Sequence, residues 1–154
     1  MTGPLEIVVE DSRWDAAADL AARAGEAVAA ALARLDGARD GEVVVLLTND
    51  ETVHALNARF RGQDKPTNVL SFPAPESEAY PGDVALAFET CAREAQAAGK
   101  SLTDHGVHLV LHGVLHLNGY DHQEEGEAAE MEALESAILT GLGMDDPYLA
   151  EMEP

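Results

Sequence analysis

EVVVLL, residues 42–47, is the clearest indication of the fold, because its five successive apolar residues, three of them β-branched, are too few for a buried helix and typical of a buried strand. LEIVVE at residues 5–10 has the same character, and extended segments follow at 68–72 and 83–88. Gly, Asp, Asn or Pro residues lie near the ends of these segments. The sequence therefore predicts a small sheet of about four strands.

Helical patterns lie between and after these strands. Apolar residues recur every three or four positions from Leu20 to Leu35, and Asn49 or Asp50 can begin a second helix that extends to about Phe60. Further helices are predicted over 89–98, from about 102 to the Asn118-Gly119 pair, and over about 124–142. We therefore predict an α+β fold, with a small mixed sheet of about four strands covered by helices.

Length and charge limit the class of protein. The chain has 154 residues, which suits a single domain over residues 1–154. Nine Lys and Arg residues against 29 Asp and Glu residues give a net charge of −20, which excludes general attraction to nucleic acid or to an anionic membrane. The single cysteine, Cys91, can form no internal disulfide, and neither a signal peptide nor an apolar run of about 18 residues is apparent. We expect a soluble, cytoplasmic protein with no membrane partner and no DNA partner.

HGVLHLNGYDH, residues 112–122, is the strongest chemical motif. His112 and His116 lie one turn apart on the same face of a predicted helix, and Gly119 can reverse the chain and bring His122 back toward them. Three imidazoles suit one Zn²⁺ ion, although nickel, copper or iron also accept such ligands. Three protein ligands leave a fourth position for water, so we predict a catalytic zinc site on this helix and the turn after it.

Each of the neighbouring polar residues has more than one possible role in this site. His105 and His108 share the helical face of the pair, and we expect them to contact a ligand histidine or the substrate, or to be merely polar. Asp121 either accepts the ring N–H of a ligand histidine or caps the last helix. The spacing HxxxHxxGxxH is that of metzincin proteases, but Gly113 stands where those enzymes carry the glutamate that activates water. A peptidase mechanism therefore lacks its general base.

A basic segment, LNARFRGQDKPTNVLSFP at residues 56–73, contains Arg59, Arg61 and Lys65 with only Asp64 opposing them. An arginine beside the metal would stabilise a phosphodiester transition state, because its planar guanidinium matches phosphate oxygens. The alternative for any one of these arginines is a surface salt bridge. We expect the three basic residues to line a local cleft that binds the substrate strand, while aromatic residues such as Phe60 belong to the core.

The two motifs, together with GDV at residues 82–84, closely resemble the YbeY family of endoribonucleases, the rRNA maturation factors of bacteria, over about residues 45–150. The resemblance implies that His112, His116 and His122 bind zinc and that Arg61 contacts RNA or supports cleavage. It also implies a single-strand-specific ribonuclease that acts on an rRNA precursor in 16S rRNA 3′-end maturation and in ribosome quality control. Ribosomal proteins or assembly factors are the implied partners.

The sequence is compatible with three functions. The first is a zinc-dependent endoribonuclease in which water or the ribose 2′-OH attacks phosphorus and Arg61 stabilises the developing charge. The second is a metal-dependent hydrolase of another substrate. The third is a metal-containing ribosome-assembly factor that binds basic ribosomal proteins through its acidic surface without turnover of its own. A fourth metal position open to water distinguishes the first two from the third.

Overall fold

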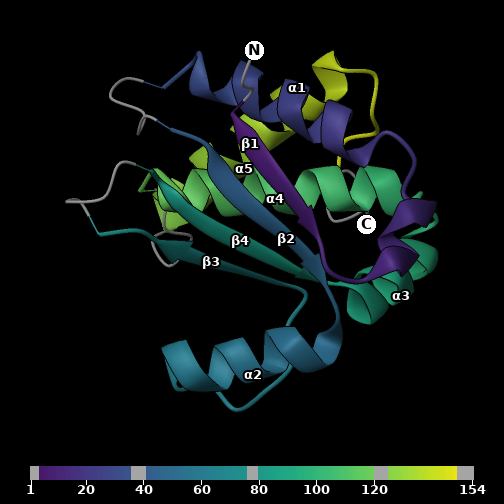
Figure 1. The fold of residues 1–154 in the computed structure, drawn as a ribbon. Coiled ribbons are helices and arrows are strands. Elements are labelled where there is room, and N and C mark those ends of the chain that lie inside the picture. Colours follow the sequence, from purple (N-terminus) through teal and green to yellow (C-terminus); the bar gives the residue numbers. More distant parts are fainter. Residues whose placement is uncertain (1–3, 36–40, 76–79, 120–124, 149–154) are drawn as a thin grey trace.

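The described part of the chain comprises residues 4–35, 41–75, 80–119 and 125–148 of a computed structural model (Figure 1). Its strands are β1 (Leu5–Val9), β2 (Val43–Thr48), β3 (Val69–Pro73) and β4 (Gly82–Ala87). Its helices are α1 (Leu20–Leu32), α2 (Asp50–Arg61), α3 (Phe88–Ala98), α4 (Leu102–Leu117) and α5 (Glu125–Gly141), with a short 3-10 helix, η1 (Ser12–Ala16). The predicted α+β fold is confirmed.

The strands form one mixed sheet in the order β1-β2-β4-β3. β2 is parallel to both β1 and β4, whereas β3 is antiparallel to β4. β1 and β3 are therefore the two edge strands. Since β3 is the last part of the basic segment, this order places the end of that segment at an edge of the sheet, where a ligand can approach.

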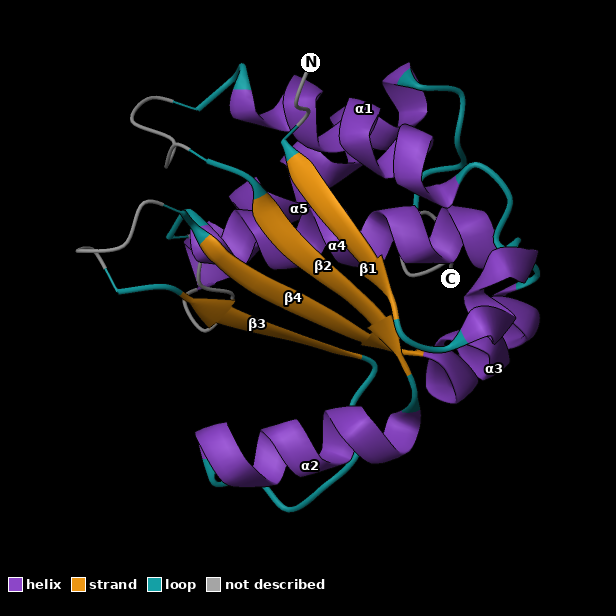
Figure 2. Ribbon diagram, in the orientation of Figure 1, coloured by secondary structure: helices purple, strands orange, loops and turns teal. Residues whose placement is uncertain are grey.

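Helices cover the two faces of the sheet unequally. α1, α4 and α5 lie on one face and α2 lies on the other (Figure 2). α4 is the central helix, because it contacts β3, β4, α1, α3 and α5. α2 packs against β3 and β4, while Val8 and Val9 on the far edge strand are exposed. Within the described residues, the helices are too short or too polar to cross a lipid bilayer.

Alternation along β2 shows how the sequence distributes side chains between these faces. Val43, Val45 and Leu47 are buried in the main core on the side of α1 and α4. Val44 and Leu46 point to the side of α2 and are only partly buried. The run of apolar residues that predicted a buried strand thus contributes side chains to both faces of the sheet. One face is covered by α1 and α4, and the other is covered by α2.

The short helix η1 is not among the predicted elements. It carries Trp14, whose side chain is buried and whose indole N–H donates a hydrogen bond of 2.8 Å to the carbonyl oxygen of Thr48. The indole also packs edge-on against Phe88, with ring centroids 5.4 Å apart. These contacts join residues that are distant in the sequence, so neither local periodicity nor a capping signal predicts η1.

Capping residues define the ends of the two helices that carry the candidate site. The side-chain oxygens of Asn49 and Ser101 each accept the backbone N–H three residues later, at 2.8 and 3.0 Å, and so begin α2 and α4. Gly62 ends α2 in the left-handed conformation, with φ of 67°. Arg61 is therefore the last residue of α2, and its side chain reaches the carbonyl oxygen of Ser71 in the middle of β3.

Candidate active site

Four histidines follow one face of α4 at spacings of three and four residues. Successive ring centroids of His105, His108, His112 and His116 are 6.5, 6.3 and 4.7 Å apart. The last two rings approach most closely, and their Nε2 atoms lie 3.2 Å from each other. Two nitrogens bound to one tetrahedral zinc ion at about 2.0–2.1 Å would lie about 3.3–3.4 Å apart. The spacing of His112 and His116 therefore fits two ligands of one metal ion.

Gly113 lies between the two histidines and faces the sheet. A Cβ atom at this position would lie 2.9 Å from Cγ1 and 3.0 Å from Cγ2 of Val84, closer than side-chain packing allows. α4 thus approaches β4 closely at the turn that carries the histidine pair. A glutamate, which metzincin proteases carry at this position, would not fit here, since the position points into the core.

Glu135 of α5 is a buried carboxylate beside these histidines. Its side chain is fully buried, and it accepts hydrogen bonds from Nε2 of His108 at 2.6 Å and Nδ1 of His112 at 3.2 Å. The hydroxyl of Tyr148 donates a third bond, of 2.7 Å. Burial alone raises the pKa of Glu135, but the hydrogen bonds from the two histidines outweigh it and lower the pKa to about 2. The carboxylate is therefore ionised at neutral pH.

Arg61 shares a cavity with the histidine pair. This metal-side cavity, of about 310 Å³, lies between α4 and the edge strand β3. It is lined by Arg61, Thr67, Asn68, Val69, Leu70, Ser71, His112, Gly113 and His116. Nη1 of Arg61 donates a 2.9 Å hydrogen bond to the carbonyl oxygen of Ser71, which anchors the guanidinium at the cavity wall. The structure thus brings Arg61 beside His112 and His116, which lie far from it in the sequence.

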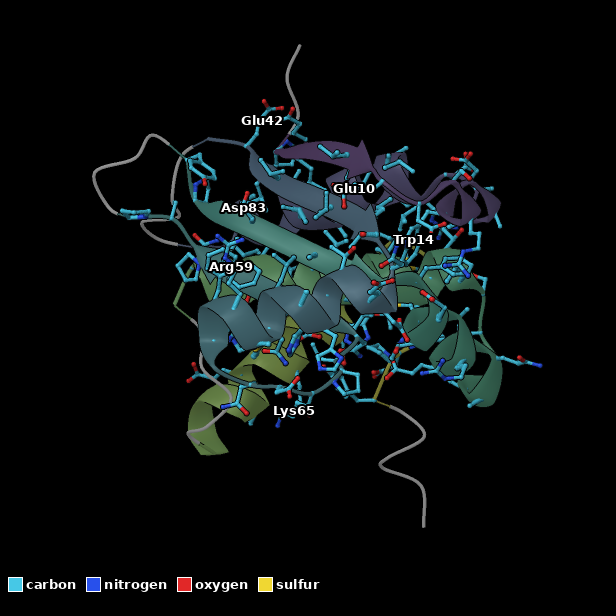
Figure 3. The ribbon with its side chains drawn as sticks, turned by 60° about the horizontal axis from the view of Figure 1, so that its bottom comes forward. Glu10, Trp14, Glu42, Arg59, Lys65 and Asp83 are labelled. Atoms are coloured by element: carbon cyan, nitrogen blue, oxygen red, sulfur yellow. The ribbon has the colours of Figure 1, made fainter. Side chains whose placement is uncertain are left out.

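Arg59 and Lys65 lie outside the wall of the metal-side cavity. Figure 3 shows them on opposite sides of α2. The guanidinium of Arg59 lies over the ring of Phe60, 5.1 Å from its centroid. Phe60 is 60% exposed, so the expectation that it belongs to the core is wrong. Substrate binding by Arg59 and Lys65 stays a prediction.

His105, the first of the four histidines along α4, is connected to the wall of the metal-side cavity through Glu94. Its Nε2 donates to Glu94 at 2.8 Å, and the same carboxylate oxygen accepts the side-chain N–H of Asn68 at 2.8 Å. Burial lowers the pKa of His105 in spite of its bond to Glu94, so the ring is neutral at physiological pH. Since Asn68 lines the metal-side cavity, this chain of bonds holds part of the cavity wall.

His122 and Asp121 lie outside the described residues, so the third predicted ligand and its predicted partner remain predictions. Among the described residues, no group of three or more His, Cys, Asp and Glu side chains is arranged to hold a metal. His108, a candidate supporting residue, shares the carboxylate of Glu135 with His112. The structure thus describes two of the three predicted ligands and one residue that supports them.

Sequence reasoning missed Glu135 and Tyr148. A signal for Glu135 was present, because it falls four residues after Met131 and three before Ile138, on the inward face of the last helix. An acidic residue on an apolar face is a buried charge that needs partners. Tyr148 gave no such signal, since it lies beyond α5 and reaches Glu135 through the tertiary fold.

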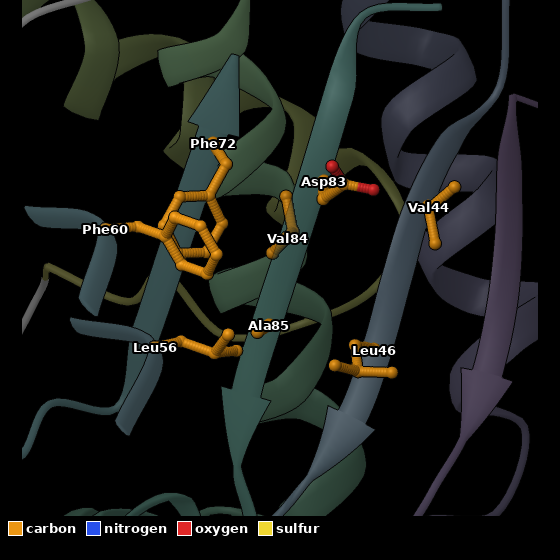
Figure 4. Close-up of a pocket in the computed structure, with 8 residues that line it drawn as sticks. All are labelled: Val44, Leu46, Leu56, Phe60, Phe72, Asp83, Val84 and Ala85. Carbon is orange, nitrogen blue, oxygen red and sulfur yellow. The ribbon is translucent and has the colours of Figure 1, made fainter. Parts of the chain in front are cut away.

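A second cavity, of about 410 Å³, opens on the opposite face of the sheet, between α2 and β2. We call it the α2-side cavity. It is lined by Val44, Leu46, Leu56, Phe60, Phe72, Asp83, Val84 and Ala85 (Figure 4). Nearly all of these side chains are apolar, and Asp83, which accepts a 3.2 Å hydrogen bond from the hydroxyl of Tyr80, is the one charged residue in the wall.

The fold and the site define the class of protein: a small mixed-sheet α+β domain whose central helix carries converging histidines opposite an arginine. The model of the family described as Endoribonuclease YbeY matches residues 7–143, and the chain belongs to this family. The resemblance noted in the motifs is thereby confirmed.

Two curated relatives show how closely the chain follows the family. The Endoribonuclease YbeY of Chelativorans sp. is 51% identical over 94% of this chain and 92% of its own length. That of Paramagnetospirillum magneticum is 51% identical over 96% of this chain and 98% of its own length. A Thermotoga maritima protein with a known solution structure aligns with a TM-score of 0.56 over 90% of this chain and 92% of its own, at 25% identity.

Proposed function

We propose that this protein is a metal-dependent endoribonuclease that cleaves single-stranded RNA. The supporting observation is that Arg61, His112 and His116 line one cavity, so that a phosphate-binding group faces a metal-binding pair. The relatives that share about half of its residues are named endoribonucleases. We place its action in the cytoplasm, on an rRNA precursor, in 16S rRNA 3′-end maturation and ribosome quality control.

His112, His116 and His122 would hold one zinc ion. The 3.2 Å separation of the two described Nε2 atoms and the preference of zinc for neutral imidazole support this assignment. When bound, zinc supplies a Lewis acid that polarises phosphoryl oxygen and lowers the pKa of water. The protein contributes the geometry of the donors, because α4 is packed tightly on β4 at Gly113.

Arg61 would bind the scissile phosphate. The bond from Nη1 to the carbonyl oxygen of Ser71 uses one of its five N–H donors and fixes the guanidinium at the wall, so the remaining donors can be aimed at phosphate oxygens. Charge that develops on those oxygens during cleavage would then be stabilised by donors already in place. Because its guanidinium is held in place, Arg61 can orient a phosphate group as well as attract it.

The small volume of the metal-side cavity favours single-stranded RNA as the substrate. At about 310 Å³ it is at the lower end of the range of small-ligand sites, about 300–1,000 Å³. A cavity of this size accepts one nucleotide-sized group. A flexible strand can place a single phosphate inside it, whereas the phosphates of a duplex are held on a wide, stiff helix.

A cleavage assay tests this proposal. Wild-type protein of known metal content is incubated with a labelled single-stranded RNA and with the same RNA annealed to its complement. We expect cleavage of the single strand only, and a loss of about 100-fold or more in the Arg61→Ala variant. Arg34→Ala, which removes an exposed arginine after α1, is the matched control and should cleave normally. Equal cleavage by Arg61→Ala and the control would contradict the role of Arg61.

The same assay separates the alternative functions. Metal bound without RNA cleavage, even in the presence of small ribosomal subunits, would favour an assembly factor without turnover. Cleavage of a generic phosphodiester with no cleavage of RNA would favour a hydrolase of another substrate. Cleavage of RNA by a His116→Ala variant at the wild-type rate would show that the activity belongs to a contaminant or to another site.

We further propose that a basic ribosomal protein or assembly factor docks on the α2 face of the sheet. The α2-side cavity provides apolar contact, and the strand register places Glu6, Val44 and Asp83 side by side across three strands. Figure 3 shows Glu10, Glu42 and Asp83 on this face. An apolar cavity with acidic surroundings complements a basic segment that carries an apolar side chain.

Binding to purified small ribosomal subunits tests this surface. Asp83→Lys should weaken the interaction, and its effect should diminish as salt is raised, because the attraction is electrostatic. Glu26→Lys makes the same charge change on the exposed side of α1 and serves as the control. Equal weakening by both variants would show that only net charge matters and that the α2 face is not the docking surface.

A further inference from the structure

Glu135 is a carboxylate placed where an apolar residue would pack. It is fully buried on α5, within a helix face that otherwise contributes Met131, Ile138 and Leu139 to the core. Burying an ionised group is unfavourable unless hydrogen bonds compensate, and replacing such a group by an apolar residue is often neutral or stabilising. Its presence at this site therefore indicates a role beyond packing.

The partners of Glu135 indicate that role. Oε2 faces Nδ1 of His112, and a carboxylate can only accept, so Nδ1 carries the proton. In a neutral imidazole the other nitrogen, Nε2, then carries the lone pair. Nε2 of His112 is the atom that faces His116 across 3.2 Å in the metal-side cavity. The hydrogen bond from Nδ1 to Glu135 thus leaves Nε2 as the nitrogen of His112 that can bind a metal ion.

We propose that Glu135 is a positioning residue of the metal site, which holds His112 with Nδ1 protonated and Nε2 directed at the metal. A carboxylate in this position also makes the ligand nitrogen a better electron donor. The inference rests on the proposed metal site and names a residue that governs its affinity. Glu135 acts through His112 and touches neither the substrate nor the metal-facing nitrogens.

The carboxylate is itself held from two other directions. His108 donates to Oε1 at 2.6 Å and Tyr148 donates to the same oxygen at 2.7 Å. Tyr148 is placed in turn by Asp146, which accepts its backbone N–H at 2.9 Å and the hydroxyl of Ser136 at 2.8 Å. Oε1 is thus occupied by these two donors, and Oε2 is the oxygen that faces His112.

This arrangement differs from an ordinary buried ion pair. A structural pair would be satisfied by His108 and Tyr148 alone, because both donate to Oε1. The second oxygen instead reaches the one neighbouring histidine whose other nitrogen faces the cavity. Three elements, α4, α5 and the turn that carries Tyr148, therefore converge to orient a single ring.

The test is the metal affinity of Glu135→Gln, measured by competition with a chromogenic zinc chelator and without RNA. Glutamine keeps the shape of the side chain but removes the charge that selects the Nδ1–H form. We expect zinc affinity to fall about 10- to 100-fold. Glu132→Gln, an exposed position one turn away on the same helix, makes the same chemical change and should bind zinc as the wild type does. Tyr148→Phe should lose only a few-fold, because Oε2 is untouched.

A second measurement keeps the inference testable if Glu135→Gln does not fold. ¹⁵N chemical shifts of the imidazole nitrogens in the metal-free wild type report which ring nitrogen carries the proton. We expect His112 to be protonated at Nδ1, and a ring protonated only at Nε2 would overturn the proposal. Unchanged zinc affinity in a folded Glu135→Gln variant would overturn it as well.

These outcomes are distinct from failure of the proposed function. If the wild type binds zinc but cleaves no RNA, the ribonuclease proposal fails while the effect of Glu135→Gln on zinc affinity still decides the role of Glu135. If the wild type binds no zinc, the metal proposal fails and the positioning role fails with it.

Discussion

The contact between Gly113 and Val84 leads to a prediction whose sign can be worked out from two glycines. Gly25 lies in the middle of α1, where an added Cβ atom would meet no described atom within 4 Å, whereas Gly113 lies in the interior of α4 against Val84. Alanine is favoured over glycine in a helix interior by about 1 kcal/mol. Gly25→Ala should therefore stabilise the protein by up to about 1 kcal/mol.

Gly113→Ala gains the same helix propensity but introduces a methyl group at 2.9 and 3.0 Å from the two Cγ atoms of Val84. Val84 is fully buried and β-branched, so it cannot turn away without disturbing the core. Overpacking of this kind costs about 1–3 kcal/mol. The net effect is a loss of about 0–2 kcal/mol, and the two alanine variants should differ by about 1–3 kcal/mol in the free energy of unfolding.

Urea unfolding of the two variants measures this difference, with the midpoint temperature as a second readout at about 2–4 °C for each kcal/mol. Val84→Ala removes both Cγ atoms, so in the double variant part of the loss caused by Gly113→Ala should be recovered. Equal stabilisation by Gly25→Ala and Gly113→Ala would refute the reasoning, because it would show that α4 and β4 are not in close contact beside the histidine pair.

Three other perturbations have defined outcomes. The pKa of Glu135 is about 2 in the folded protein and ordinarily 4.5. The folded protein with Glu135 ionised is therefore more stable than with Glu135 protonated by roughly 3 kcal/mol, a difference that is complete above about pH 4.5 and is lost as the pH falls toward 2. Urea unfolding between about pH 3 and pH 6 should show this slope in the wild type and a shallower one in Glu135→Gln, and equal slopes would contradict it. Trp14→Phe leaves the carbonyl oxygen of Thr48 without its indole donor and should lower the free energy of unfolding by about 1–3 kcal/mol, measured in urea; no change would mean that this bond does not hold η1 on the sheet. Asn49→Ala removes the cap of α2 and should cost about 0.5–2 kcal/mol, with rescue by Asn49→Ser or Asn49→Asp, whereas a loss that neither residue restores would point to some other role for Asn49.

The strands and helices could be predicted because their signals are local. The apolar run at 42–47 became β2, and the capping signal at Asn49 marked the start of α2. Strand order was not predictable in this way. The placement of β4 between β2 and β3 depends on which apolar faces meet across the fold, and nothing in the local pattern of β3 or β4 encodes it.

The candidate site, too, could be predicted only where its signal in the sequence is local. His112 and His116 follow from a helical spacing, and the structure brings their Nε2 atoms within 3.2 Å. The resemblance to a family singled out Arg61, while its approach to the same cavity depends on the close packing of α4 against the sheet. Glu135 was overlooked because an acidic residue in an acidic helix is ordinarily exposed, and only the tertiary contacts of α5 with α4 reveal its burial.

The central claim is that Arg61 and the histidines of α4 form one metal-dependent site for RNA cleavage. The most direct measurement is the rate of cleavage of a single-stranded RNA by protein stripped of metal with a chelator and then restored with one equivalent of zinc. We predict loss of cleavage on stripping, recovery at one equivalent, and no recovery in His116→Ala although that variant remains folded. Undiminished cleavage by the stripped protein, with its metal content verified as negligible, would contradict the claim.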